Sequence, residues 1–246
     1  MKSADEWLQQ AADLFEVKQH ADVAAIAREG LAAFPHEGRL WQALGNALWY
    51  LDRWRESHHA LESASALIPL SPLGQRVLAE CYCRAGKPDL AILLFRHLLQ
   101  KGRCPSELLP GIAASLGRLR KDKLALRACR ILARRHPKRH HAHFGTAYYL
   151  QRLGATARQV VPSLKRAVRL APHLLHYRLN LAFVWASTGQ IASARKVIAK
   201  IDSTSILHPA WLVKMKSIFE LAGDAARARS CARQLQRIAQ GRCLFD

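Results

Sequence analysis

The chain has 246 residues, of which half are apolar, and it carries a formal net charge of +20. No apolar run approaches the ~20 residues that a membrane-spanning helix needs, so the sequence indicates a chain with ample material for a buried core and no membrane span. Six cysteines without framework spacing, and an N-terminus without the apolar core of a signal peptide, predict free thiols and a cytoplasmic protein.

One residue pattern recurs seven times along the chain, in steps of 34 residues. A single position of this pattern is occupied in turn by Trp7, Trp41, Gln75, Leu109 and, after a slip of one residue, His143, Arg178 and Leu212. In the second copy the apolar stripe of a first helix is formed by Trp41, Leu44, Gly45 and Leu48. Asp52 and Arg53 then make a turn, and a second helix ends before Pro69. Each copy is therefore predicted to be two helices joined by a tight turn.

The copies follow one another without a linker, so we expect one continuous domain over residues 1–246. The predicted repeats cover residues 4–37, 38–71, 72–105, 106–139, 140–174, 175–208 and 209–242. A small residue recurs where the two helices of a pair must approach closely, namely Gly45, Ala79, Ala113, Ala147 and Ala182. Helices of this length are unstable singly in water, so each pair must bury its apolar face against the next.

The pattern resembles the tetratricopeptide repeat, whose motif reads Trp, Leu-Gly, Tyr, Ala, Phe/Tyr, Ala, Pro. The third repeat supplies Leu78, Ala79, Tyr82, Gly86, Ala91 and Phe95. The resemblance implies an all-α fold, a right-handed α-α superhelix of about seven repeats. It also implies a non-enzymatic adaptor that binds another protein through a concave groove lined by the first helices, without a cofactor.

The charge is unevenly distributed along the chain. Residues 1–70 carry six Lys/Arg against ten Asp/Glu, whereas the remainder carries 32 against eight. An acidic partner is the natural inference: an acidic protein segment, a nucleic acid or an anionic membrane face. Genome composition is the alternative, since arginine outnumbers lysine 26 to 12, but it does not account for the acidic first seventy residues.

The repeat register predicts which side chains line the groove. On the side of the first helices opposite the apolar stripe, arginine recurs at repeat position 13. The groove set is Asn46, Trp49, Tyr50, Arg76, Arg84, Arg118, Tyr148, Arg152 and Phe183. Planar cations bordered by aromatic rings suit an extended acidic peptide, because arginine binds carboxylates bidentately. The alternative is that position 13 is a solvated helix end, where the helix dipole also favours arginine.

A second basic surface is predicted on the opposite, convex side of repeats four and five. It consists of Arg127, Arg130, Arg134, Arg158, Lys165 and Arg169. Such a stripe suits the phosphates of RNA or DNA, although it has few interleaved aromatic residues for base stacking. Nucleic-acid binding is therefore the second hypothesis. Self-assembly is the third, with Leu244 and Phe245 of the tail docking onto the last repeat or onto a neighbour.

Catalytic and metal sites are not indicated. The sequence has no phosphate-binding loop, zinc-protease helix or nucleophile elbow, and only eight carboxylates follow residue 70. Cys81 and Cys83 point to different sides of a helix, so with Cys104 they make a poor tetrahedral zinc set. Cys129 and Cys231 fall in small-residue positions, where we expect buried free thiols.

Overall fold

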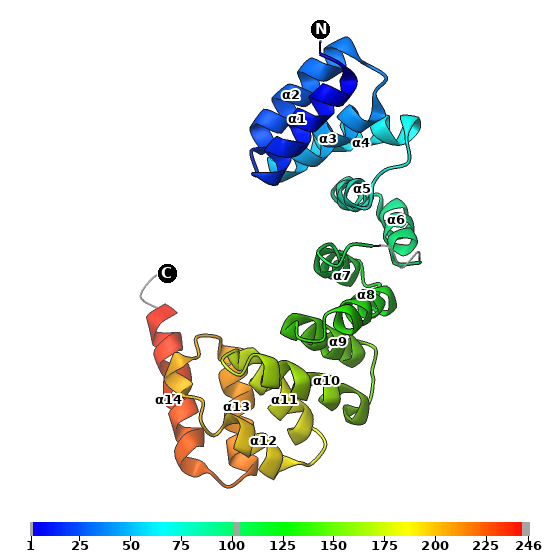
Figure 1. Ribbon diagram of the computed structural model, residues 1–246. Helices are drawn as coiled ribbons and strands as arrows, with labels where there is room; N and C mark the ends of the chain where they lie inside the picture. The colour runs from blue at the N-terminus through cyan, green and yellow to red at the C-terminus, as the bar shows by residue number, and fades with distance from the viewer. Residues whose placement is uncertain (1, 101–103, 243–246) are drawn as a thin grey trace. The chain divides into compact units, whose positions relative to one another are not determined.

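The computed structural model describes residues 2–100 and 104–242, and all regular structure in these residues is helical (Figure 1). They form fourteen α-helices and a short 3-10 helix at Ser203–Ser205. The α-helices are α1 (Ala4–Glu16), α2 (His20–Ala33), α3 (Gly38–Tyr50), α4 (Trp54–Leu67), α5 (Pro72–Arg84), α6 (Pro88–Gln100), α7 (Leu109–Arg118), α8 (Asp122–Arg135), α9 (His140–Arg152), α10 (Ala157–Leu170), α11 (Leu175–Ala186), α12 (Ile191–Ile198), α13 (Pro209–Leu221) and α14 (Ala225–Arg242). Leu244 and Phe245 lie outside the described residues, so the predicted tail contact is untested.

The helices form pairs, each made of a first or A helix (odd numbers) and a second or B helix (even numbers). Six of the A helices begin at the first residue of a predicted repeat, and α7 begins three residues late, at Leu109 instead of 106. Pro110 explains the delay: its missing N–H is tolerated in the first turn of a helix but not deeper inside.

The turn between the two helices of a pair has the same backbone conformation in every repeat. Repeat position 15 has a positive φ in all seven turns, between 57° and 77°, and is occupied by Lys18, Asp52, Gly86, Arg120, Gly154, Gly189 and Gly223. This left-handed conformation ends the A helix and reverses the chain. Glycine adopts it without steric cost, whereas Lys18, Asp52 and Arg120 are strained there.

The chain divides into two compact units, residues 1–128 (unit 1) and 129–246 (unit 2). In unit 1 the A and B helices approach closely at Gly45, where an added Cβ would lie 2.5 Å from the Leu61 Cγ. The buried Ser57 hydroxyl donates to the Gly45 carbonyl oxygen across the same contact, at 2.7 Å. The predicted need for a small residue at this position is thus confirmed for α3 and α4.

Unit 2 has its own core. Its largest fully buried side chains include Leu164, Ile198 and Phe219, and α13 and α14 pack around Met215 and Cys231. The two cysteines expected to be buried free thiols, Cys129 and Cys231, are both buried and free. Among the described residues, no helix is long and apolar enough to cross a membrane.

Candidate functional site

The A helices of unit 1 present a buried acid between two arginines. Glu80 on α5 is only 8% exposed, and its carboxylate lies 3.3 Å from the Arg118 guanidinium on α7 and 3.8 Å from that of Arg76 on its own helix. The Ser115 hydroxyl donates to the same carboxylate at 2.7 Å. Two of the predicted groove cations are therefore bound to a carboxylate of the chain itself.

A second intramolecular ion pair neutralises the next arginine. Arg84, at position 13 of α5, donates to Asp52 in the turn after α3 at 2.7 Å, and its guanidinium lies 4.8 Å from the Trp49 ring centroid. The pair joins two consecutive repeats and is exposed to solvent. Arg84 thus has an electrostatic partner before any ligand binds.

The remaining groove residues of unit 1 lie on α3. Asn46 is 7% exposed, and its side-chain oxygen has no hydrogen-bond partner among the described residues. Tyr50 is half exposed and stacks on the His20 ring, with centroids 4.5 Å apart, while Phe15 contacts both rings edge-on. An unsatisfied amide oxygen beside an exposed aromatic ring is an arrangement that a polypeptide backbone could complete.

The A helices of unit 2 present aromatic rings with cations over them. Tyr148 is 45% exposed and Phe183 40% exposed. The Arg152 guanidinium lies 5.7 Å from the Tyr148 ring, and the Lys214 ammonium lies 4.3 Å from the Phe183 ring and 4.9 Å from the Trp211 ring. These four residues, Tyr148, Arg152, Phe183 and Lys214, come from three successive A helices, and we call them the aromatic–cation surface.

Further aromatic contacts hold α9 against α11. Phe144 stacks on Tyr177 with centroids 4.4 Å apart, His176 meets Phe144 edge-on, and the His140 Nδ1 lies 2.9 Å from the Tyr177 hydroxyl oxygen. Burial, followed by the neighbouring His140, lowers the pKa of His176. The same two causes, together with Arg139, lower the pKa of His141. Both groups therefore favour the neutral form.

The two units differ sharply in charge. Unit 1 has 17 Lys/Arg against 14 Asp/Glu, whereas unit 2 has 21 against four. The residues from 123 to 201 include 16 Lys/Arg and no acid at all. In the described part of unit 2 the carboxylates are already engaged: Asp224 with Arg195 and Arg227, Glu220 with Lys216, and Asp202 with Thr204. Most of the positive charge of unit 2 is therefore uncompensated.

The B helices expose the other predicted basic residues. Arg127, Arg130 and Arg134 are exposed on α8, and Arg158, Lys165 and Arg169 are exposed on α10. Lys165 also lies 5.3 Å from the Trp185 ring. The arginines thus lie on surfaces a polyanion could reach.

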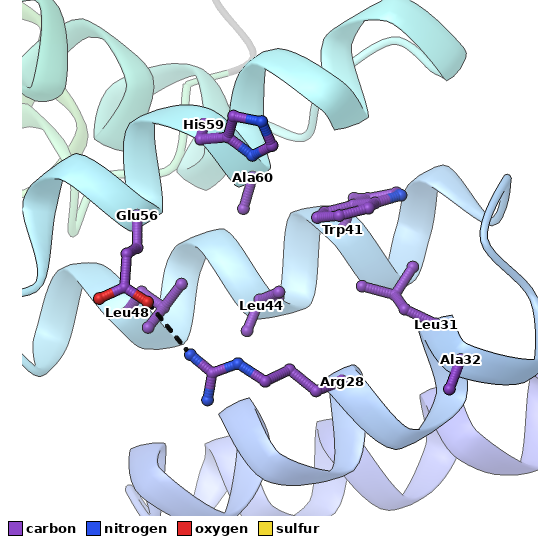
Figure 2. A pocket seen from close by; sticks show the side chains of 9 residues that line it. All are labelled: Arg28, Leu31, Ala32, Trp41, Leu44, Leu48, Glu56, His59 and Ala60. Atoms are coloured by element: carbon purple, nitrogen blue, oxygen red, sulfur yellow. Dashed lines mark hydrogen bonds and ion pairs between the residues drawn. The ribbon is translucent and has the colours of Figure 1, made fainter.

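Unit 1 also has a pocket of about 440 Å³ between α2, α3 and α4, shown in Figure 2. Its floor is apolar, with Leu44 and Leu48, and Trp41 meets His59 edge-on at its wall. An ion pair of 3.4 Å between Arg28 and Glu56 crosses it. The pocket is thus a shallow groove between neighbouring repeats, bridged by the chain's own side chains.

Comparisons with known proteins agree with this architecture. Residues 43–106 match the family model described as tetratricopeptide repeat. The C-terminal part of a TPR repeat-containing protein from Cytophaga hutchinsonii superposes with a TM-score of 0.71 over 94% of this chain and 95% of that one, at 10% identity. Residues 43–106 therefore carry tetratricopeptide repeat sequence, and the chain has the all-helical fold of tetratricopeptide repeat proteins. The predicted family and its all-helical solenoid class are confirmed.

Two further solved structures resemble this chain. PilF from Pseudomonas aeruginosa has a TM-score of 0.62 at 16% identity, covering 83% of this chain and 92% of that one. YrrB, described as a TPR protein with an unusual peptide-binding site, has a TM-score of 0.57 at 14% identity, covering 71% and 90%. Comparison with curated proteins gave no match. At these identities the likeness shows the fold.

The tetratricopeptide fold implies a protein-interaction adaptor or scaffold, and proteins of this fold are generally non-enzymatic. Burial raises the pKa of Cys81 to about 11 and that of Cys129 to about 12, so neither is a ready thiolate nucleophile. No group of His, Cys, Asp or Glu within the described residues is arranged to bind a metal ion.

The structure brings some predicted groove residues together and adds others. In unit 1, Arg76 and Arg118 meet at Glu80, and Trp49 meets Arg84. In unit 2, Tyr148 meets Arg152. Sequence reasoning did not single out Lys214 and Trp211. Their signal was their place in the register: Lys214 occupies position 6 of the last repeat, on the same side of the A helix as positions 9 and 13.

Proposed function

We propose that this tetratricopeptide protein is an adaptor that binds an acidic segment of a partner protein, chiefly through the aromatic–cation surface of unit 2. The observation that carries the proposal is the pairing of exposed rings with cations, Tyr148 with Arg152 and Phe183 with Lys214. It occurs in the unit where basic residues outnumber acidic ones 21 to four.

Each part of this surface has a chemical role in the proposal. The two rings offer rigid apolar area at a low entropy cost, so they would anchor apolar side chains of the ligand. A guanidinium has five N–H donors and satisfies a carboxylate bidentately while it still lies over a ring. The ligand class that fits is therefore a segment in which Asp or Glu alternates with apolar or aromatic residues.

Unit 1 would contribute a second, weaker surface made of Asn46, Trp49, Tyr50, Arg76, Arg84 and Arg118. The Asn46 side-chain oxygen would accept a backbone N–H of the ligand, beside Tyr50. The arginines already bind Asp52 and Glu80, so an incoming carboxylate must compete with them. Because unit 2 has 21 basic residues against four acidic ones, we expect most of the charge-dependent affinity to come from unit 2.

The test begins with selection of peptides from a random display library on the full-length protein, followed by titration calorimetry with the best peptide. We expect the selected peptides to be rich in Asp and Glu, interspersed with apolar residues. Changing both Arg152 and Lys214 to Glu should weaken binding by about 100-fold, because two attractive contacts become repulsive. Tyr148→Ala with Phe183→Ala should weaken it by about tenfold or more.

The matched control is the double change of Arg84 and Lys87 to Glu in unit 1, which makes the same alteration of net charge. It should weaken binding by less than about threefold, because unit 1 would contribute only the weaker surface. Selection of peptides without acidic enrichment would contradict the proposal. So would equal losses from the unit 1 and unit 2 reversals, since these would indicate a response to net charge alone.

Nucleic-acid binding through the B-helix face is the second candidate. The observation that favours it is the exposure of Arg158, Lys165 and Arg169 on α10, within the acid-free run of residues 123–201. Gel-shift titration with single-stranded RNA and duplex DNA at low salt tests it. Binding that falls steeply with salt, and is lost when these three residues become Gln, would support this candidate, and no shift at low salt would eliminate it.

A further inference from the structure

The B helices of unit 1 enclose two equivalent grooves in successive repeats. The first is the 440 Å³ pocket between α2, α3 and α4, and the second, of about 770 Å³, lies between α4, α5 and α6. Seven of the nine residues that line the first groove have a counterpart 34 residues later in the lining of the second. The pairs are Leu31 and Ser65, Trp41 and Gln75, Leu44 and Leu78, Leu48 and Tyr82, Glu56 and Leu90, His59 and Leu93, and Ala60 and Leu94.

The two grooves differ in the residues that would close them. In the first, Glu56 is bound by Arg28 across the opening and His59 meets Trp41 edge-on (Figure 2). In the second, these two positions are Leu90 and Leu93, which are 43% and 59% exposed. Leucines thus occupy the positions that carry an ion pair and a ring contact in the first groove, although exposing them to water is unfavourable.

The solvent face of α6 beside this groove carries opposite charges around its central leucine. Asp89, Leu93, Arg96 and Gln100 are all exposed and recur at the spacing of one helical face. Within the described part of the chain, Asp89 and Arg96 make no ion pair. One acid thus precedes Leu93 by four residues, and one base follows it by three.

This face of α6 is complementary in charge to the same face of a second copy in antiparallel orientation. In an antiparallel pair of α6 helices with a two-fold axis beside Leu93, residue 89 of one copy lies opposite residues 96–97 of the other. Asp89 would then meet Arg96 of the second copy, and the symmetry makes this contact twice. Leu90 and Leu93 of each copy would enter the 770 Å³ groove of the other.

We propose that the α4–α5–α6 groove is a homodimer interface, occupied by α6 of a second copy of this chain in antiparallel orientation. This inference is independent of the acidic-segment function of unit 2. The charge pattern favours a second copy over an unrelated helix, because α6 itself carries the acid, the leucine ridge and the base in the order that the reversed groove requires.

Sedimentation velocity of the full chain, over a micromolar to sub-millimolar series, tests the proposal. Leu93→Glu should raise the dimer dissociation constant at least ~100-fold, since it places two carboxylates face to face in an apolar contact. Asp89→Arg alone and Arg96→Asp alone should each raise it about tenfold, because like charges then oppose each other twice per dimer.

Two combinations test the antiparallel register. The double variant Asp89→Arg with Arg96→Asp should restore the wild-type constant. A mixture of the two single variants should form a heterodimer more tightly than either variant forms a homodimer. Val17→Glu, at an apolar residue 66% exposed elsewhere in unit 1, is the matched control and should change nothing.

Circular dichroism should show the same helicity and melting for all variants, since the changed residues are exposed. A chain that stays monomeric through the sub-millimolar range would overturn the proposal. So would a dimer that survives Leu93→Glu, or a double charge reversal that fails to restore association.

Discussion

Units 1 and 2 use the same helix pairs to present opposite kinds of surface. Arginine occupies position 13 of the A helix at Arg84, Arg118 and Arg152. In unit 1 the first two are bound to Asp52 and Glu80, each supplied by the preceding repeat. In unit 2, Arg152 lies over the Tyr148 ring. In unit 1 this repeat position thus joins consecutive repeats through ion pairs, and in unit 2 it borders an exposed aromatic ring.

The two units differ in how many acids they contain to pair with their cations. A buried carboxylate such as Glu80 requires nearby cations, because its desolvation is costly without them. Unit 1 therefore uses cations to stabilise its own packing. Unit 2 has only four acids against 21 basic residues, so most of its positive charge is not balanced within the unit.

The largest expected effect on stability comes from substituting Glu80. Glu80→Gln should lower the free energy of unfolding of unit 1 by about 3 kcal/mol, because Arg76 and Arg118 lose the carboxylate between them. Urea denaturation followed by hydrogen-exchange mass spectrometry of unit 1 peptides measures it. Glu62→Gln, at an exposed hydrogen bond to Tyr82, is the control and should cost under about 0.5 kcal/mol. Equal losses would show that the Glu80 cluster is not structural.

Salt should act on the units differently. Raising ionic strength screens repulsion among the 21 basic residues of unit 2, so its stability should rise by about 1 kcal/mol. Unit 1, with 17 basic and 14 acidic residues, should change little. Hydrogen-exchange protection of each unit at low and high sodium chloride measures the difference. If salt changed the stability of both units equally, the expected difference in charge repulsion between them would be contradicted.

Substitutions at position 15 of the turns should change the free energy of unfolding by an amount similar to the salt effect. Arg120→Gly in unit 1 should stabilise the chain by about 1 kcal/mol, because its φ of 58° strains a side chain with a Cβ. Gly154→Ala in unit 2, at a φ of 74°, should destabilise it by about the same amount. Thermal melting monitored by circular dichroism measures both. An unchanged melting point in either variant would show that the turn relaxes.

The smallest expected effect is a pH dependence of unit 2. Folding lowers the pKa of His141 and His176 below their ordinary value of 6.5, chiefly by burial. As pH falls through 6.5, the unfolded chain therefore takes up protons more readily, and unit 2 loses stability that it has in full above that pH. Changing both residues to Gln should flatten the decline in melting temperature between neutral and mildly acidic pH.

Much of the fold was predictable from local pattern. The 34-residue period placed the starts of six A helices, because the period records which residues face the neighbouring repeat. The delayed start of α7 had its signal in Pro110. The ion pairs were not predictable in the same way. Glu80 and Arg118 are 38 residues apart, and only the packing of α5 against α7 brings them to 3.3 Å.

Periodicity and charge are properties of the chain, so the helix pairs, the resemblance to tetratricopeptide repeats and the concentration of positive charge after residue 70 could all be predicted from the sequence. The tertiary structure decided which cations are engaged and which surfaces are open. It pairs Arg84 and Arg118 with acids of the preceding repeat and places Lys214 over the Phe183 ring. It also exposes Leu90 and Leu93 to solvent at the groove between α4, α5 and α6. The physical reason is that ion pairs and burial depend on distances of a few ångströms between helices, which the spacing of residues along the chain does not specify.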